Sequence, residues 1–349
     1  MDLTKIFPVL HVKGTNYEMG YSIGKTFKSR INHALNTCDQ LHLNAEKDKR
    51  NPKFLDSLLQ HANKHLPQYI DEIQGMADGA SCDFRLLLIH NLRHSFQSAN
   101  NCSTVIFKHT DHMVFGHNED NLKSLGMNSY IIMAHLENGG HYLAFTNAGS
   151  LNGNAWGFNS HGIAMSGNAM PNFSPNDTFP RILIDRNLME ATSINDVIHR
   201  ISTIPKRAGV YSYNIASLHE HRVINIETIA DDIAITEISD RYFHTNHYIS
   251  PKFKHLSQNV SGSSLTRYTA GHEEIQKVHG TAEDVKNILF HENIHVEEKS
   301  NVSGDTGLTL CTPVFELSSN QINLNLFSNK DRNLPIFQMS LDELKHGEN

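Results

Sequence analysis

The stretch NCSTVIFKHTDHMVFGHNED, residues 101–120, sets one cysteine, Cys102, at the head of an apolar run. A second apolar run follows the turn signal Thr110-Asp111, which predicts two antiparallel strands joined as a hairpin. Such a hairpin returns the acidic pair Glu119-Asp120 to the start of the first strand. Because a thiol becomes a good nucleophile only when another group takes its proton, this layout indicates a self-activating amidohydrolase.

The proton acceptor in this interpretation is the chain's own α-amino group. If the peptide bond between Asn101 and Cys102 is cut, the freed amine has a pKa of about 7.7–8.0, which suits a general base. It lies on the same residue as the thiol, so most of the cost of orienting the two groups is already met. The polar residues Asn100, Asn101, Ser103 and Thr104 are compatible with a scissile loop. From residue type alone, the alternative is a buried structural cysteine.

Composition limits the other function classes. The chain has 349 residues, of which 39% are hydrophobic and 19% charged, as in a soluble globular protein. The net charge of −7 disfavours a nucleic-acid binder, and no apolar run approaches the roughly 20 residues of a membrane span. The N-terminus lacks a signal-peptide pattern, which predicts a cytoplasmic protein. The scattered cysteines predict reduced thiols and form no CxxC pair that would suggest zinc. The sequence implies neither a metal nor an organic cofactor.

The pattern of elements changes near residue 101. Residues 1–98 read as helical, with one helical stretch at 58–76 divided or kinked by Pro67. From Ser103 onward the chain alternates short strands with helix pairs at 181–201 and 264–290. Runs of antiparallel hairpins with helix pairs between them predict an α+β fold built in layers.

Several short motifs, in order along most of the chain, resemble one enzyme family. They are GTNYEMG (14–20), EIQGMADGA (72–80), CST (102–104), GHNED (116–120), GFNSHGIA (157–164), HTNH (244–247) and SSLTR (263–267). Each motif is weak alone, but their order and distances together resemble the isopenicillin N acyltransferase family (the C45 peptidases) of N-terminal nucleophile hydrolases.

The resemblance implies a four-layer αββα sandwich that cuts itself between Asn101 and Cys102. Residues 1–101 would form an N-terminal helical chain and residues 102–349 a catalytic chain of the same domain. The two chains would stay associated, and assembly into a homo-oligomer stays open. The mature enzyme would split a small-molecule linear amide through a Cys102 acyl-enzyme. The alternative is an acyltransferase that passes an acyl group from a thioester or an amide to an amine.

The resemblance also implies roles for single residues. Cys102 would be the nucleophile in self-cleavage and turnover, and Asp120 would orient its amine. Asn246 would donate a side-chain N–H to the oxyanion, a contact that contributes roughly 2.7–4 kcal/mol in comparable sites. Arg267 would pair with Asp120 or with a substrate carboxylate, since a guanidinium suits both.

Three further residues are candidates for substrate binding. Asn168 would contact the substrate amide or complete the oxyanion hole. Trp156 and Phe158 would line the acyl pocket, although packing in the core explains both residues equally well.

Two other interpretations remain open. The string His291-Glu292-Asn293-Ile294-His295 matches the HExxH pattern of zinc hydrolases, which requires both histidines on one helix face. Familiar members of the acyltransferase family have glycine where this chain has Asn101. If Asn101 blocks cleavage, the fold would persist as an unprocessed binding protein without enzymatic activity.

Overall fold

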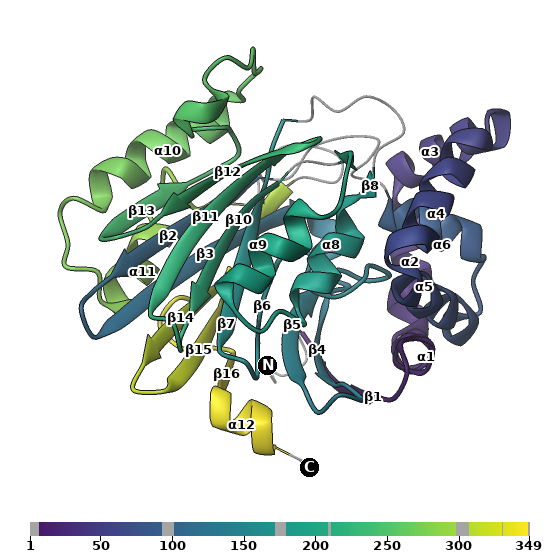
Figure 1. The fold of residues 1–349 in the computed structure, drawn as a ribbon, viewed down its shortest axis with the longest axis horizontal. Coiled ribbons are helices and arrows are strands. Elements are labelled where there is room, and N and C mark those ends of the chain that lie inside the picture. Colours follow the sequence, from purple (N-terminus) through teal and green to yellow (C-terminus); the bar gives the residue numbers. More distant parts are fainter. Residues whose placement is uncertain are drawn as a thin grey trace.

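Two stacked β-sheets lie between two layers of helices, which confirms the expected α+β, four-layer αββα architecture (Figure 1). The structure, a computed structural model, describes residues 7–92, 101–171, 179–208, 211–297, 307–329 and 331–347. Asn100, part of the expected scissile loop, lies outside the described residues, whereas Asn101 and Cys102 are inside them.

The larger sheet has eight strands. In spatial order they are β1 (Val9–Lys13), β4 (Tyr130–His135), β5 (His141–Thr146), β6 (Trp156–Asn159), β7 (Ile163–Ala169), β10 (Tyr211–Ser217), β11 (Arg222–Ile229) and β12 (Asp232–Glu237). All neighbours in this sheet are antiparallel except β1 and β4, which are parallel.

The smaller sheet has six antiparallel strands. In spatial order they are β13 (Arg241–His244), β2 (Cys102–Lys108), β3 (His112–Leu122), β14 (Gly307–Ser318), β15 (Gln321–Ser328) and β16 (Phe337–Ser340). The expected hairpin is β2–β3, and its register pairs Cys102 with Glu119. A separate pair of two-residue strands joins β8 (Phe179–Pro180) to β9 (Arg207–Ala208).

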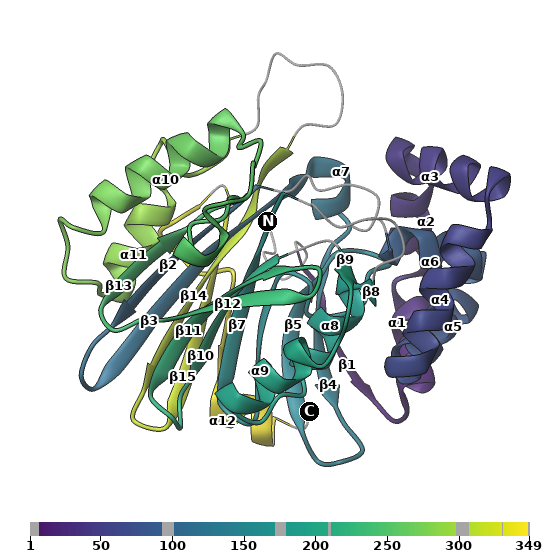
Figure 2. The ribbon, with the colours of Figure 1, turned by 45° about the horizontal axis from the view of Figure 1, so that its top comes forward.

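Helices cover the outer face of each sheet. The eight-stranded sheet carries α1 (Asn16–Thr26), α2 (Lys28–Thr37), α3 (Asp39–Arg50), α4 (Lys53–His65), α5 (Pro67–Ala80), α6 (Phe84–Asn91), α8 (Arg181–Leu188) and α9 (Ile194–Ser202). The six-stranded sheet carries α10 (Gly262–Glu274) and α11 (Ala282–Leu289). Short helices α7 (Lys123–Gly126) and α12 (Leu341–His346) and a 3₁₀ turn (Pro251–Phe253) complete the set. Figure 2 shows α1–α6 gathered on one side and α10 and α11 on the other.

The buried faces of β2 explain how the sheets stack. Val105 and Phe107 pack in the apolar cluster under α10 and α11, whereas Ile106 packs in the cluster between the two sheets. Successive side chains of a strand point to opposite faces. Cys102 and Thr104 therefore share the face of Ile106 and point into the space between the sheets.

The N-terminal segment is not only helical, because β1 adds a strand to the edge of the eight-stranded sheet. Behind it, α1 and α5 pack at glycine contacts: a Cβ on Gly20 would lie 2.0 Å from the Glu72 carbonyl oxygen, and one on Gly79 would lie 2.2 Å from the Tyr21 carbonyl oxygen. Only glycine permits so close an approach. As expected, Pro67 divides the long helical stretch, since α4 ends at His65 and α5 begins at Pro67.

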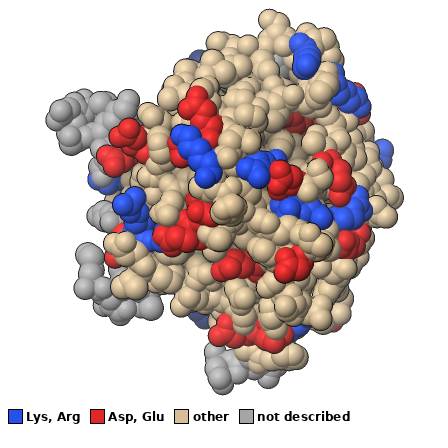
Figure 3. Space-filling view, turned by 90° about the vertical axis from the view of Figure 1, so that its left-hand side faces the viewer, with Lys and Arg blue, Asp and Glu red and all other residues tan. Residues whose placement is uncertain are grey.

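The described helices and one face of the surface bear on two predictions, that the chain has no membrane span and that it binds no nucleic acid. Across the described ranges, no helix combines the length and apolar character needed to cross a bilayer. On the face that carries α10 and α11, acidic and basic side chains are interspersed (Figure 3). The cytoplasmic location and the absence of a nucleic-acid partner stay predictions.

Candidate active site

Cys102 begins β2 and is buried, with 1% of its surface exposed. Burial raises the pKa of its thiol well above the usual range, and the nearby Glu119 and Asp120 carboxylates raise it further. A hydrogen bond from the Asp120 backbone and the charge of Arg267 act in the opposite direction. In the uncut chain the thiol is therefore protonated at neutral pH.

Two side chains hold the peptide group of Cys102. Its backbone N–H donates to Asn246 Oδ1 at 2.9 Å, and its carbonyl oxygen accepts from Arg267 Nη1 at 2.5 Å. Asn246 follows β13, the strand next to β2, and Arg267 lies on α10. The sequence prediction that Cys102, Asn246 and Arg267 share one site is consistent with this geometry.

The orientation of Asn246 differs from the expected one. Its Oδ1 accepts from the Cys102 N–H and from Arg267 Nη2, both of which can only donate. Its Nδ2 donates to the Ala169 carbonyl oxygen at 3.0 Å. These partners fix the amide orientation, so Asn246 presents an acceptor to Cys102 and not the expected N–H donor.

Arg267 uses its whole guanidinium on neutral oxygen atoms. Nη1 donates to the Cys102 carbonyl and Ser103 Oγ, Nη2 to Asn101 Oδ1 and Asn246 Oδ1, and Nε to Ser263 Oγ. These contacts occupy all five N–H donors. The expected direct pairing with Asp120 or a substrate carboxylate is thus replaced by contacts to the chain around Cys102.

Asp120 lies on the other side of β3 from the thiol. Its Oδ1 accepts from Thr309 Oγ1 at 2.6 Å, and its buried Oδ2 has no hydrogen-bond partner within the described ranges. Burial raises the pKa of Asp120 to about 7, while the charge of Arg267 and the Thr309 hydrogen bond lower it. The expected contact of Asp120 with the Cys102 amine is not made in the uncut chain, and Asp120 acts on the site through its charge.

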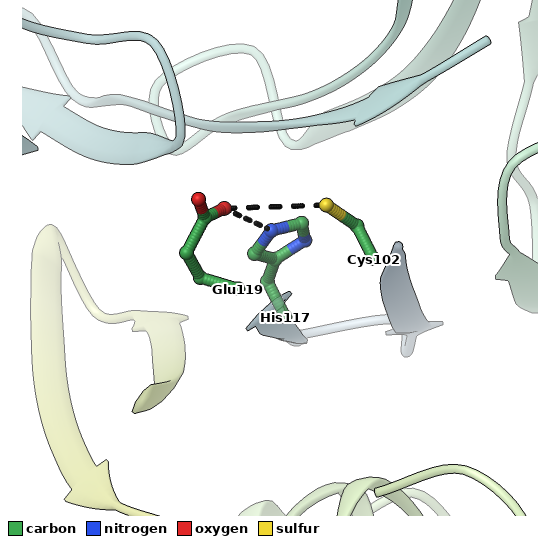
Figure 4. Close-up of side chains that lie close together, drawn as sticks. All are labelled: Cys102, His117 and Glu119. Atoms are coloured by element: carbon green, nitrogen blue, oxygen red, sulfur yellow. Dashed lines mark hydrogen bonds and ion pairs between the residues drawn. The ribbon is translucent and has the colours of Figure 1, made fainter. Parts of the chain in front are cut away.

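Two residues that sequence reasoning missed face the thiol directly (Figure 4). Cys102 Sγ lies 4.0 Å from Glu119 Oε2, and His117 Nε2 lies 3.5 Å from the same oxygen. The alternation of side chains along β3 is the signal that would have found them. Glu119 pairs with Cys102, so Glu119 and His117 point to the face of the thiol and Asp120 does not.

The same three residues are the group in the described chain whose ligand atoms lie close enough to hold a metal ion. One atom from each of Cys102, His117 and Glu119 lies within 4.8 Å of the others. A thiolate, an imidazole and a carboxylate suit a transition metal such as zinc. The same atoms equally form a proton-sharing cluster.

Asn168 lies in the polar layer between the sheets. Its Oδ1 accepts from Thr104 Oγ1 at 3.0 Å and from Asn214 Nδ2 at 2.8 Å. Its buried Nδ2 has no hydrogen-bond partner among the described residues. Asn168 thus has a free donor near the nucleophile's strand, and its contact with a substrate stays a prediction.

Trp156 and Phe158 lie in the core between the sheets, in line with the packing alternative, and their contact with a substrate stays a prediction. Both are fully buried, and they pack against aromatic rings between the sheets. Trp156 stacks on Phe145 with ring centroids 5.5 Å apart and meets Phe315 edge-on, as Phe158 does. These contacts account for the burial of both side chains.

The HExxH string does not form a zinc-hydrolase helix. Helix α11 ends at Leu289, and the string after it forms only a separate turn, in which the His295 N–H donates to the His291 carbonyl oxygen at 2.9 Å. His291 lies 3.8 Å from Glu274, and His295 stacks on Phe290. The zinc-hydrolase alternative is therefore wrong for this string.

Comparison with known proteins identifies the class. The family model described as acyl-coenzyme A:6-aminopenicillanic acid acyl-transferase matches residues 107–331, more than half of the chain. The chain belongs to this family of acyltransferases and hydrolases, as its motifs indicate.

Two curated relatives and one solved structure are similar to it. The beta-alanyl-dopamine/carcinine hydrolase of Drosophila melanogaster is 28% identical over 61% of this chain, and the match spans only 60% of that relative's length. The 40 kDa form of acyl-coenzyme A:6-aminopenicillanic-acid-acyltransferase from Emericella nidulans is 26% identical over 68% of this chain and 69% of its own. A mutant conjugated bile acid hydrolase from Clostridium perfringens has a TM-score of 0.42 and 12% identity, over 68% of this chain and 96% of its own.

Proposed function

We propose that this chain is the precursor of a self-processing amide hydrolase that cuts its own Asn101–Cys102 bond. The mature enzyme then attacks a linear amide with the Cys102 thiol, releases the amine and passes the acyl group to water. In the alternative outcome, the acyl group comes from an amide or a thioester and goes to an amine.

The observation that carries this proposal is the set of hydrogen bonds that Asn246 and Arg267 make to the backbone around Cys102. Asn246 Oδ1 binds the nitrogen of the bond to be cut, and Arg267 binds the carbonyl of Cys102 and the Asn101 side chain. A nucleophile that attacks the preceding carbonyl needs such fixed geometry, because a misplacement of about 1 Å can cost 10²-fold in rate. Nothing about a structural cysteine requires these contacts.

Cleavage changes what the Cys102 nitrogen can do. As an amide it is only a donor, and Asn246 Oδ1 accepts its proton at 2.9 Å. As a free amine it gains a lone pair beside the thiol while Asn246 still accepts one of its N–H bonds. The buried thiol with a raised pKa thus acquires a base on its own residue, which explains why the uncut chain would be inactive.

Contacts across the cleavage point support the proposal that the two chains stay together. Glu72 on α5 pairs with Arg186 on α8 at 3.0 Å, and both side chains are fully buried. Asn91 Nδ2 donates to the Gly149 carbonyl, and its Oδ1 accepts from the Leu151 N–H, each at 2.8 Å. None of these bonds involves the segment to be cut.

The substrate class follows the two relatives. A hydrolase for β-alanyl amides and an acyltransferase share this family, so we propose that the acyl group is small or linear and bound through an amide. Beta-alanyl amines and an acyl-thioester offered with an amine are the two probes that separate hydrolysis from transfer.

Intact mass spectrometry tests self-cleavage. The wild-type protein should appear as two fragments, residues 1–101 and 102–349, whereas Cys102→Ala should remain one chain of 39.3 kDa. Cys311→Ala is the matched control, because Cys311 is also a fully buried cysteine in the same sheet and should leave cleavage unchanged.

Turnover is tested on the same samples. Wild type should release amine from an amide probe and show an acyl adduct on Cys102, and Cys102→Ala should show neither. A wild-type protein that splits amides while its backbone stays intact through residue 102 would refute the proposal.

A further inference from the structure

Self-cleavage requires a base that the mature mechanism does not supply. Before the Asn101–Cys102 bond is cut, the Cys102 nitrogen is an amide and cannot take the thiol proton. The thiol itself is buried, and its pKa is raised well above the usual range. The inference below rests on the proposed self-cleavage and concerns its first proton transfer.

Glu119 is placed to take that proton. It is the register partner of Cys102 in the β2–β3 hairpin, so both side chains point between the sheets. The thiol sulfur lies 4.0 Å from Glu119 Oε2, and both groups are nearly fully buried. The next residue, Asp120, points to the opposite face, where its Oδ1 meets Thr309.

His117 holds the carboxylate in place through a chain of hydrogen bonds. Thr104 Oγ1 has one proton, which goes to Asn168 Oδ1 at 3.0 Å, and it accepts from Asn214 Nδ2 at 3.2 Å. Its contact with His117 Nδ1 at 2.9 Å must therefore carry the histidine's proton. This directs His117 Nε2 toward Glu119 Oε2 at 3.5 Å, which sets the position of the carboxylate beside the thiol.

We propose that Glu119 is the catalytic base of self-cleavage and that His117 is its positioning residue. The Cys102 S–H proton moves to Glu119 Oε2 while Sγ forms a bond to the Asn101 carbonyl carbon. The carbon–nitrogen bond then breaks, and the proton passes from the Glu119 carboxyl to the departing Cys102 nitrogen. Water next hydrolyses the thioester, which yields the Asn101 carboxylate and the free thiol beside its new amine.

The charge balance favours transfer to a carboxylate over formation of a free thiolate. A thiolate formed while Glu119 stays ionised would place a second anion beside a buried carboxylate, whereas proton transfer leaves Glu119 neutral. Other charged or titratable groups face this cluster from the packed elements: Cys311 on β14, Tyr211 on β10, Arg181 on α8 and Arg267 on α10. The pH profile of cleavage is therefore compared between variants and not assigned to one group from a single curve.

The test measures the rate of self-cleavage of freshly refolded full-length protein by intact mass. Glu119→Gln keeps the shape of the side chain but cannot take a proton, so cleavage should slow by about 10²-fold or more. Glu119→Asp restores a carboxylate one methylene further back and should cleave at an intermediate rate. His117→Asn should displace the pH profile of cleavage, because the imidazole that contacts Glu119 Oε2 is removed. Cys38→Ala, which changes a buried cysteine between α2 and α3, outside this cluster, should cleave as wild type does.

The outcomes separate this inference from the proposed function. Wild type that remains uncut overturns both. Wild type that cuts itself, with Glu119→Gln equally fast, overturns only the role of Glu119. If Glu119→Gln proves unfolded by circular dichroism, the comparison of Glu119→Asp with wild type decides, and equal rates with superimposable pH profiles count against the base.

Discussion

Two buried arginines show how differently the fold uses the same charge. Arg186 on α8 meets two carboxylates, Glu72 at 3.0 Å and Glu190 at 2.9 Å, and its guanidinium lies over the rings of Tyr69 and Tyr142. Arg267 on α10 meets only neutral oxygens of the chain around Cys102.

The difference is visible in the electrostatics of each arginine. Burial alone lowers the pKa of an arginine, but Glu72 and the surrounding groups raise the pKa of Arg186 overall. For Arg267 burial dominates and the pKa is lowered, although Asp120 and Cys102 oppose it. The charge of Arg186 is neutralised where α5 meets α8, whereas Arg267 keeps its charge beside the Asn101–Cys102 bond that we propose is cut.

The first test of this comparison removes the buried ion pair of Arg186 with Glu72. Arg186→Met leaves the Glu72 carboxylate buried without its partner, so the free energy of unfolding should fall by about 3–5 kcal/mol. Denaturant unfolding measures it, with all chains carrying Cys102→Ala so that self-cleavage does not change the unfolding species. The rate of self-cleavage in folded Arg186→Met with Cys102 retained should stay near that of wild type.

A double variant separates charge from packing. Glu72→Gln with Arg186→Met removes both charges, so it should lose less stability than Arg186→Met alone. If the double variant is less stable than Arg186→Met, the stability at this place depends on the hydrogen bonds of Glu72 with Asn16 and Asn152 more than on charge compensation.

The second test removes the hydrogen bonds that Arg267 makes to the chain around Cys102. Arg267→Met removes the Arg267 donor from the Cys102 carbonyl and leaves Asn246 Oδ1 with the Cys102 N–H alone, and self-cleavage should slow by about 10²-fold through lost positioning. Arg267→Lys keeps the charge but lacks the planar guanidinium, so its rate of self-cleavage should lie between those of wild type and Arg267→Met. Gel time courses of cleavage give the rates; Arg267→Met cutting at the wild-type rate would show that the contacts are incidental.

Sequence alone predicted the layers and the strand that carries the nucleophile, because alternation and turn signals are local. It also named Cys102, Asn246 and Arg267, although they are 144 and 165 residues apart along the chain at their contacts. It assigned the carboxylate beside Cys102 to Asp120, whereas Glu119 is the residue that faces the thiol. That choice depends on the hairpin register, and a shift of one residue exchanges the two faces.

Other features depend on partners that no local pattern reveals. The orientation of the Asn246 amide is set by the Ala169 carbonyl on the other sheet, 77 residues away. Whether Trp156 lines a pocket or fills the core is set by Phe145 and Phe315. The strand β1 was missed because it is a single edge strand whose partner, β4, lies more than a hundred residues downstream.

The last test concerns Asp120, a buried carboxyl whose charge acts on Arg267 although no hydrogen bond joins the two side chains. Burial raises the pKa of Asp120 from its ordinary 3.8 to about 7 in the folded chain. Between these values the folded state holds a proton that the unfolded state has lost, so stability must fall as the pH rises from about 4 to about 7. The loss amounts to about 1.4 kcal/mol for each pH unit in that window.

Replacing the carboxyl removes this dependence. In Cys102→Ala chains, the free energy of unfolding of Asp120→Asn relative to Asp120 should rise steadily from pH 4 to pH 7 and level off above pH 7, because asparagine does not titrate. Denaturant unfolding at each pH gives the difference. A flat difference would mean that Asp120 is already ionised at pH 4, held as an anion by Arg267 despite the absence of a direct bond, and the two arginines would then both be neutralised.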